Sequence, residues 1–241
     1  MLQDDLIGFG LLIAYFVVVG VPLLFLKAVD RLPLEIARKS YHLVITFSII
    51  PMLRLFSSWA VAVFVALLLM VVVYLILARI EDTTFFRRIA VERESGEFKR
   101  SLVIVQVTIA TLIFVFWGLL GADWKYVALV AVLAWGLGDA AAALVGKSFG
   151  RNPIQHRWLD GKKTYEGTFA MLAVAGTVIF STLILYAQQP WHISLFVALL
   201  AAPVGAVVEL FSHRGLDTIT VPLAVGFSVL VLMCIFTLLG A

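Results

Sequence analysis

Four carboxylates of this chain stand inside or at the ends of four different apolar runs. They are Asp139, Glu166, Glu209 and Asp217. Lysines accompany them, namely Lys147, Lys162 and Lys163. Carboxylate oxygens are ligands that Mg²⁺ prefers, and ammonium groups neutralise phosphate oxygens. If folding brings these groups together, their types suit a site for magnesium and a polyphosphate.

Asp139 is the most deeply placed of the four acids. It lies about two turns inside its apolar run, roughly 12 Å along a helix from Lys147. A carboxylate at that depth costs several kcal/mol unless it faces a partner, water or a metal ion, so it is a functional candidate. The structural alternative is an acid–base network that only ties helix ends together. For a single residue the two interpretations are equally good, whereas the whole set favours the functional one.

The apolar runs themselves are long enough to cross a membrane. Hydrophobic residues make up 63% of the 241 residues, far more than in a soluble domain. We predict an all-α, polytopic transmembrane helix bundle with about eight spans, which forms a single domain over residues 1–241. The first run follows Asp4 and Asp5 rather than a basic segment, so no removable signal peptide is indicated. The predicted spans are approximately 6–26, 41–56, 59–79, 101–121, 125–146, 165–187, 192–212 and 217–240.

The basic residues predict how this bundle is oriented. Of the 18 lysines and arginines, all but Arg54 and Lys125 fall in alternate connections, on one side of the predicted membrane. The positive-inside rule assigns that side to the cytoplasm and both termini to the opposite side. This asymmetry favours anionic lipid head groups or a soluble anionic substrate. Nucleic acid is excluded as a partner, because no basic segment extends beyond the membrane surface.

The predicted topology brings all the candidate groups to the cytoplasmic face. The four acids and three lysines lie there, and Arg38, Lys39 and His42 lie at the same level. The spans that begin near 165 and 217 start at this face, so their positive dipole ends favour an anion there.

Two local signals concern how helices meet at this face. Gly138, Ala142 and Gly146 recur every four residues, which lets a neighbouring helix approach closely. Thr164 is a candidate N-cap of the span that follows it.

Other patterns carry no chemistry. Gly146-Lys147-Ser148 resembles the end of a P-loop, but Ala141 stands where the first glycine belongs, and the segment follows a membrane helix instead of a strand. His156, His192 and His213 have no metal-ligand spacing. The single cysteine, Cys234, lies inside the last span and is expected to have a packing role.

Three segments resemble motifs of the CTP-dependent lipid-alcohol kinases, a family that includes dolichol and polyprenol kinases, phytol kinase and the yeast-type diacylglycerol kinase. Arg38-Lys39-Ser40-Tyr41-His42 is similar to an N-terminal Arg-Lys-x-x-His element. Gly138-Asp139, Gly146 to Gly150 and Gly161 to Gly167 are similar to the cytidine-nucleotide region. Glu209 followed by Asp217 to Pro222 is similar to a C-terminal acidic element. Here the chain departs from the pattern, since Leu216-Asp217-Thr218 replaces a pair of acidic or amide residues, which puts the number of metal ligands in doubt.

The resemblance implies a role for each candidate. The metal ligands would be Asp139 and Asp217, with Glu209 as a third ligand or an outer-sphere group. The nucleotide would be bound by Gly138, Lys147, Lys162, Lys163 and Thr164, and phosphate or the lipid head group by Arg38 and Lys39. The general base would be His42, whose ordinary pKa lies near neutrality, or else Asp139 or Glu166. The expected reactants are CTP, Mg²⁺ and a membrane lipid alcohol (a polyprenol or dolichol, phytol or diacylglycerol).

Two other functions remain open from the sequence. Gly161 to Gly167 also resembles the phosphatidate cytidylyltransferases, which attack the α-phosphorus of CTP, although their C-terminal cluster of acids and arginines is missing. An ion- or proton-coupled transporter would need polar groups across the whole membrane. Here the outer half of the predicted bundle is almost wholly apolar.

Overall fold

The computed structural model describes residues 2–92, 96–155, 157, 159, 163–212 and 215–240. Their regular structure is helical, apart from one isolated bridge between Pro153 and Thr164. This confirms the predicted all-α fold. The chain divides into two compact units, Met1–Gly118 and Leu119–Ala241, which we call unit 1 and unit 2 and describe separately. The prediction that they act as one domain stays a prediction.

Seven helical segments in the described residues are long and apolar enough to cross a membrane. This confirms the prediction of a polytopic membrane bundle, because a span needs about 20 mainly apolar residues. The segments are Gln3–Ala28, Trp59–Ile80, Glu97–Leu119, Ala122–Phe149, Tyr165–Leu185, Trp191–Phe211 and Asp217–Leu238.

The helix predicted over 41–56 is divided in the structure. It consists of α3 (Leu34–Phe47) and α4 (Ile49–Leu55), which meet at Ser48. Pro51 has no N–H to donate to the carbonyl of Phe47. The Ser48 hydroxyl at the break donates to the carbonyl of Ile45 at 2.6 Å. Neither helix alone has the length of a span, although together they cover about 33 Å at 1.5 Å per residue.

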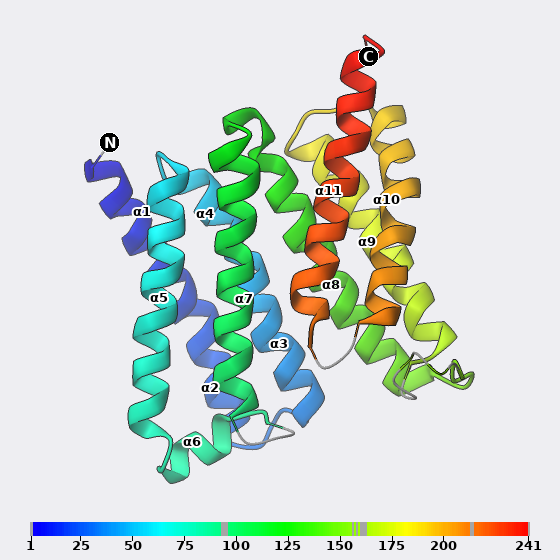
Figure 1. Cartoon of the computed structure of the whole chain (residues 1–241). Coiled ribbons are helices and arrows are strands. Elements are labelled where there is room, and N and C mark those ends of the chain that lie inside the picture. Colours follow the sequence, from blue (N-terminus) through cyan, green and yellow to red (C-terminus); the bar gives the residue numbers. More distant parts are fainter. Residues whose placement is uncertain are drawn as a thin grey trace. The chain divides into compact units, whose positions relative to one another are not determined.

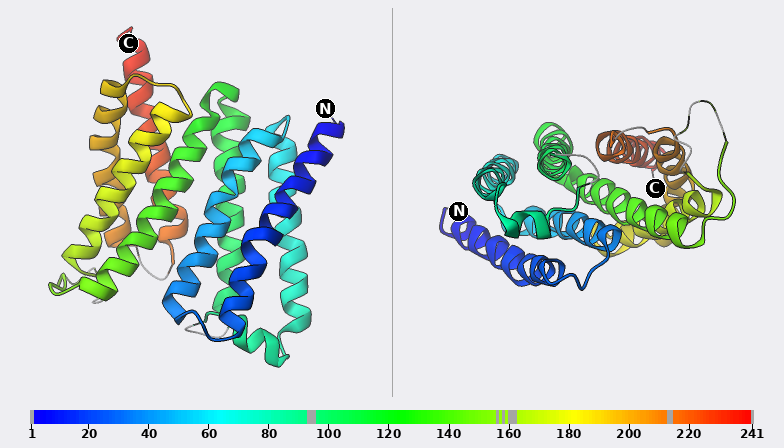
Figure 2. Two further views of the ribbon diagram at one scale, coloured as in Figure 1. Left: turned by 180° about the vertical axis from the view of Figure 1, so that it is seen from behind. Right: turned by 90° about the horizontal axis from the view of Figure 1, so that it is seen from below.

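Some helices of unit 1 change their hydrogen-bonding pattern along their length. The first span is built from α1, a π-helical segment and α2, which form one continuous rod in Figure 2. After α7 the chain continues as a second π-helical segment, Phe114–Leu119, which ends one residue beyond the boundary of the unit. In Figure 1, α5 lies beside α7, and these two helices pack together. The remaining bounds are α1 (Leu2–Tyr15), η1 (Phe16–Gly20), α2 (Val21–Ala28), α5 (Trp59–Ile80), α6 (Thr84–Ile89) and α7 (Glu97–Ile113).

Unit 2 consists of four long helices that run alternately up and down (Figure 1). The end of α8, the start of α9, the end of α10 and the start of α11 therefore lie at one end of the unit, which we call the polar end. Within unit 2, α8 packs against α9 and α11, and α10 packs against the same two helices. The bounds are η3 (Ala122–Trp124), α8 (Lys125–Phe149), α9 (Tyr165–Leu185), α10 (Trp191–Phe211) and α11 (Asp217–Leu238).

Small residues bring α8 and α9 into close contact. A Cβ atom on Gly167 of α9 would lie 2.9 Å from the carbonyl oxygen of Ala142, and one on Gly146 would lie 3.1 Å from Thr164 Oγ1. Further along the same face, Gly138 lies directly against the sulfur of Met171. The predicted close approach along Gly138, Ala142 and Gly146 is therefore confirmed, with α9 as the partner helix.

Candidate active site

The beginning and the end of the connection between α8 and α9 are bonded to each other. Ile154 N–H donates to the carbonyl of Lys163 at 2.9 Å, and Tyr165 N–H donates to the carbonyl of Asn152 at 3.1 Å. Together with the bridge between Pro153 and Thr164, these bonds hold Lys163 and Thr164 in a fixed position next to the start of α9.

The first turn of α9 is capped as the sequence predicts. Thr164 has an extended backbone, and its Oγ1 accepts a hydrogen bond from Gly167 N–H at 3.2 Å. Such a cap satisfies one of the otherwise unpaired amide groups at a helix start. Thr164 is therefore the N-cap, while its contact with a nucleotide stays a prediction.

Glu166 links the first turn of α9 to Asn152 in the connection that precedes this helix. Its Oε1 accepts hydrogen bonds from Asn152 N–H at 3.2 Å and from Asn152 Nδ2 at 2.7 Å. The carboxylate therefore fixes the position of the segment that carries Lys163 and Thr164. Sequence reasoning missed Asn152, although an asparagine in a short connection is typical of a residue that bonds to neighbouring groups.

An ion pair joins the start of α9 to the end of α10. Lys163 Nζ pairs with the carboxylate of Glu209 and also donates to the Glu209 carbonyl oxygen at 3.1 Å. Glu209 is almost fully buried, with 4% of its surface exposed. A buried carboxylate needs a charged or hydrogen-bonding partner, and Lys163 supplies one. Two groups 46 residues apart are thus brought together at the polar end, as the predicted topology requires.

The other candidates of unit 2 that the structure describes lie on α8 and α11. Asp139 lies within α8 and is buried, with 9% of its surface exposed. Lys147 stands in the last turn of α8, and Asp217 in the first turn of α11. Gly138 contacts Met171, so packing accounts for a glycine there. Lys162 lies outside the described residues.

Within the described residues, no three His, Cys, Asp or Glu side chains gather closely enough to form a metal-binding group. The ligand set Asp139, Glu209 and Asp217 therefore stays a prediction. Mg²⁺ commonly uses only one or two protein carboxylates and completes its coordination with water and substrate phosphates. The acids of the polar end are compatible with that mode, with Glu209 engaged by Lys163.

The candidates of unit 1 lie on α3. Arg38 Nη2 donates to Glu35 Oε2 at 2.9 Å, which is a pair within one helical turn. Lys39 is buried, with 5% of its surface exposed, and His42 follows one turn later. The roles predicted for Arg38, Lys39 and His42 stay predictions.

Comparison with known proteins supports the resemblance drawn from the motifs. A phytol kinase from Synechocystis sp. is 36% identical to this chain over 94 residues, which are 39% of this chain and 38% of that kinase. The match therefore covers less than two fifths of the kinase. No family model matches the chain, and no solved structure matches it.

Proposed function

We propose that this protein is a CTP-dependent kinase that transfers the γ-phosphoryl group to the hydroxyl of a membrane lipid alcohol. The observation that carries the proposal is the similarity to a phytol kinase, in a chain with several spans. The acids and lysines of the polar end support it, because phosphoryl transfer depends mainly on positioning and on neutralisation of charge. We place the reaction at the cytoplasmic interface, where a soluble nucleotide and a bilayer alcohol can meet.

Each charged group of the polar end has a part in this proposal. Lys147, Lys162 and Lys163 would neutralise the triphosphate. Asp139 and Asp217 would hold Mg²⁺, which supplies charge neutralisation at the phosphate oxygens when it is bound. Glu209 would keep Lys163 oriented until the nucleotide arrives. Glu166 would hold the segment that carries Lys163 through its bonds to Asn152.

The main alternative is a cytidylyltransferase that forms a CDP-lipid from phosphatidate. The segment Gly161 to Gly167 favours it as much as it favours a kinase, and both reactions use CTP and Mg²⁺. They differ in the phosphorus atom attacked and so in the products. A kinase releases CDP and leaves one phosphate on the lipid, whereas a cytidylyltransferase releases pyrophosphate.

The test is to incubate the purified protein with Mg²⁺ and with CTP or ATP labelled at either the α- or the γ-position, together with polyprenols, phytol, diacylglycerol or phosphatidate. Transfer of the γ-label to an alcohol, with release of CDP, supports the proposal. Transfer of the α-label to phosphatidate would instead establish the cytidylyltransferase. Phosphorylation with ATP in place of CTP would correct the nucleotide alone.

The variant Asp139→Asn tests the role of the buried acid. If Asp139 holds the metal ion, the variant should lower kcat by at least about 100-fold. Each tenfold corresponds to about 1.4 kcal/mol of lost transition-state stabilisation. The matched control is Asp123→Asn. Asp123 is exposed and lies just before the first residue of α8, so this variant should keep full activity. Equal activity of the two variants would remove Asp139 from the site.

A further inference from the structure

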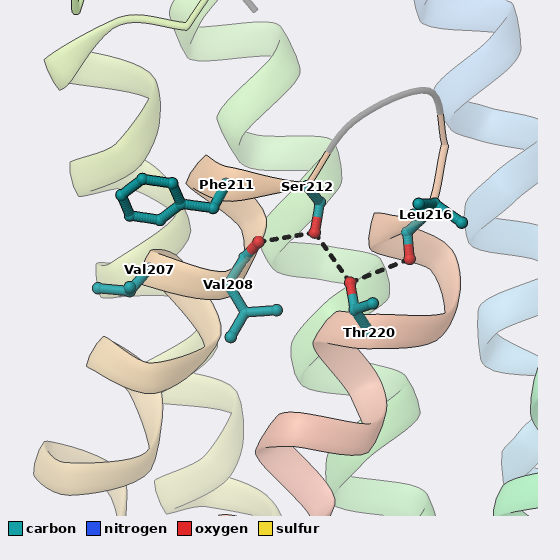
Figure 3. Close-up of a pocket in the computed structure, with 6 residues that line it drawn as sticks. All are labelled: Val207, Val208, Phe211, Ser212, Leu216 and Thr220. Carbon is teal, nitrogen blue, oxygen red and sulfur yellow. Dashed lines mark hydrogen bonds between the residues drawn. The ribbon is translucent and has the colours of Figure 1, made fainter. Parts of the chain in front are cut away.

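A hollow opens on the surface of unit 2 between the last turns of α10 and the first turns of α11 (Figure 3). Its volume is about 320 Å³, within the range of about 300–1,000 Å³ that is usual for small-molecule pockets. It is lined by Val207, Val208, Phe211, Ser212, Leu216 and Thr220. The lining begins two positions before Glu209 of α10, and Leu216 and Thr220 flank Asp217 at the start of α11.

Most of the lining is apolar and faces outwards. Val207, Phe211 and Leu216 expose 53%, 44% and 55% of their surfaces. Val207 and Phe211 belong to the last turns of the candidate span Trp191–Phe211, and Leu216 directly precedes the candidate span Asp217–Leu238. Exposed apolar side chains at the end of a span face the edge of the hydrocarbon layer. A molecule that enters this hollow therefore arrives from the bilayer and has an apolar body.

Two hydroxyl groups form the polar part of the hollow. Ser212 Oγ and Thr220 Oγ1 lie 2.8 Å apart, and Figure 3 shows this contact between the two helices. Ser212 Oγ also lies 2.7 Å from the carbonyl oxygen of Val208, and Thr220 Oγ1 lies 3.0 Å from that of Leu216.

These three contacts use every proton that the hydroxyl pair can donate. Each hydroxyl has one proton and two acceptor lone pairs, so the two protons can fill only two of the three contacts at a time, and acceptor lone pairs remain. The pair is therefore better suited to accept a further hydrogen bond than to donate one. An alcohol O–H is a donor of that kind, whereas an ester or a methyl ether is not.

The hydroxyl pair is connected to the ion pair through one backbone carbonyl. Ser212 N–H donates to the carbonyl oxygen of Glu209 at 3.2 Å, and Lys163 Nζ donates to the same oxygen at 3.1 Å. Ser212 lies three residues after Glu209, which is about 4.5 Å along a helix axis. A hydroxyl bound at Ser212 would thus lie within about one helical turn of the Lys163–Glu209 pair.

From these observations we infer that the hollow between α10 and α11 is where the long-chain alcohol docks, with its hydroxyl donating to the Ser212–Thr220 pair. The part of its chain nearest the hydroxyl lies along Val207, Phe211 and Leu216, and the remainder extends among lipid tails. Ser212 and Thr220 act as positioning residues. This inference rests on the proposed function, because it names the place at which that reaction takes its acceptor.

Photolabelling tests the docking directly and requires no turnover. The full chain in phospholipid nanodiscs is irradiated with a long-chain alcohol that carries a diazirine near its hydroxyl, and labelled peptides are identified by mass spectrometry. We expect labelling to concentrate on residues 207–212 and 215–220 and to fall at least tenfold in Val207→Trp. The matched control Val231→Trp, at a residue of α11 that is 55% exposed, should label as the unmodified chain does. Equal labelling all along the lipid-facing helices would overturn the inference.

A second probe tests the role of the hydroxyl. The methyl ether of the same diazirine alcohol keeps the chain but has no proton to donate. We expect the ether to label the hollow at least tenfold less than the alcohol does. Equal labelling by the two probes would mean that the hollow takes any acyl or alkyl chain of the bilayer, and the alcohol-specific docking would be wrong.

Kinetics separate failure of this inference from failure of the proposed function. Thr220→Val and Ser212→Ala should each raise the KM for the alcohol by about tenfold and leave the KM for CTP unchanged. The matched controls are Thr237→Val and Ser181→Ala, whose hydroxyls bond to the carbonyls of Met233 and Thr177 elsewhere in unit 2. If the protein is a kinase and its KM for the alcohol does not change in Thr220→Val, Ser212→Ala and Val207→Trp, the proposed function holds and the proposed docking site is wrong. A protein that phosphorylates no alcohol would lose the function, and the two probes would still decide the docking.

Discussion

The polar end of unit 2 differs from helices α3 and α7 of unit 1 in how far its polar side chains are hydrogen-bonded. In unit 2 the carboxylates of Glu166 and Glu209 are bonded to residues of other segments, Asn152 and Lys163. In unit 1, several buried oxygens make no hydrogen bond with the described residues: Tyr41 Oη and Thr46 Oγ1 on α3, and Gln106 Oε1 and Thr108 Oγ1 on α7. Because an unsatisfied buried polar group is costly, these groups of unit 1 weaken the fold where those of unit 2 support it.

The helices of the two units also differ in regularity. Unit 1 contains two π-helical segments and the break at Ser48. The four long helices of unit 2 are continuous, and Gly146 and Gly167 hold α8 and α9 in close contact. The comparison indicates that unit 2 depends on specific contacts between its helices at the proposed reaction site. We therefore expect substitutions at its polar end to be less tolerated than similar substitutions in unit 1.

The ion pair between Lys163 and Glu209 should give the largest effect. Lys163→Met leaves a buried carboxylate without its cation, which costs about 3 kcal/mol. The matched change in unit 1 is Lys27→Met, because the partner of Lys27, Asp30, has 82% of its side chain exposed, and an exposed pair contributes under about 1 kcal/mol. The measurement is the free energy of unfolding in mixed detergent. Similar losses for the two variants would contradict the comparison.

The contact between α8 and α9 should give the next largest effect. Gly167→Ala places a methyl group 2.9 Å from the backbone oxygen of Ala142, and such overpacking costs about 1–3 kcal/mol. Gly10→Ala in α1 is the control, since no described atom beyond the neighbouring backbone of its own helix lies within 4 Å of the added methyl group and alanine favours a helix over glycine. Unfolding of both variants on heating in detergent provides the measurement. A stability of Gly167→Ala equal to that of Gly10→Ala would show that the helices can separate without cost.

The unsatisfied hydroxyls of unit 1 should give the smallest effect. Thr46→Val and Thr108→Val keep the shape of the side chain and remove a buried oxygen that makes no hydrogen bond with the described residues, so stability should stay the same or rise slightly. In unit 2, Ser194 is buried and its hydroxyl donates to the carbonyl of Pro190 at 3.0 Å. Ser194→Ala should therefore cost about 1 kcal/mol. A clear loss of stability in either threonine variant would reveal a hydrogen bond or a bound molecule at that position.

The sequence by itself determined the helices of unit 2. The predicted spans 125–146 and 165–187 are observed as Lys125–Phe149 and Tyr165–Leu185, and 192–212 and 217–240 are observed as Trp191–Phe211 and Asp217–Leu238. A run of about 20 apolar residues has one stable form in lipid, because a helix satisfies every backbone group within itself. Thr164 and the small-residue face of α8 were predictable for the same reason, since each signal depends on residues a few positions apart.

Only the tertiary structure decided which groups meet. The sequence predicted Lys147, Lys162 and Lys163 at the same level, and only the packing of α9 against α10 shows that Lys163 meets Glu209. The Ser212–Thr220 contact likewise depends on how α10 and α11 are rotated against each other. A periodic pattern fixes which residues share a helix face, but the rotation and depth of each helix follow from contacts with its neighbours. For that reason the elements of this protein could be predicted from its sequence, whereas the partners of its polar side chains could not.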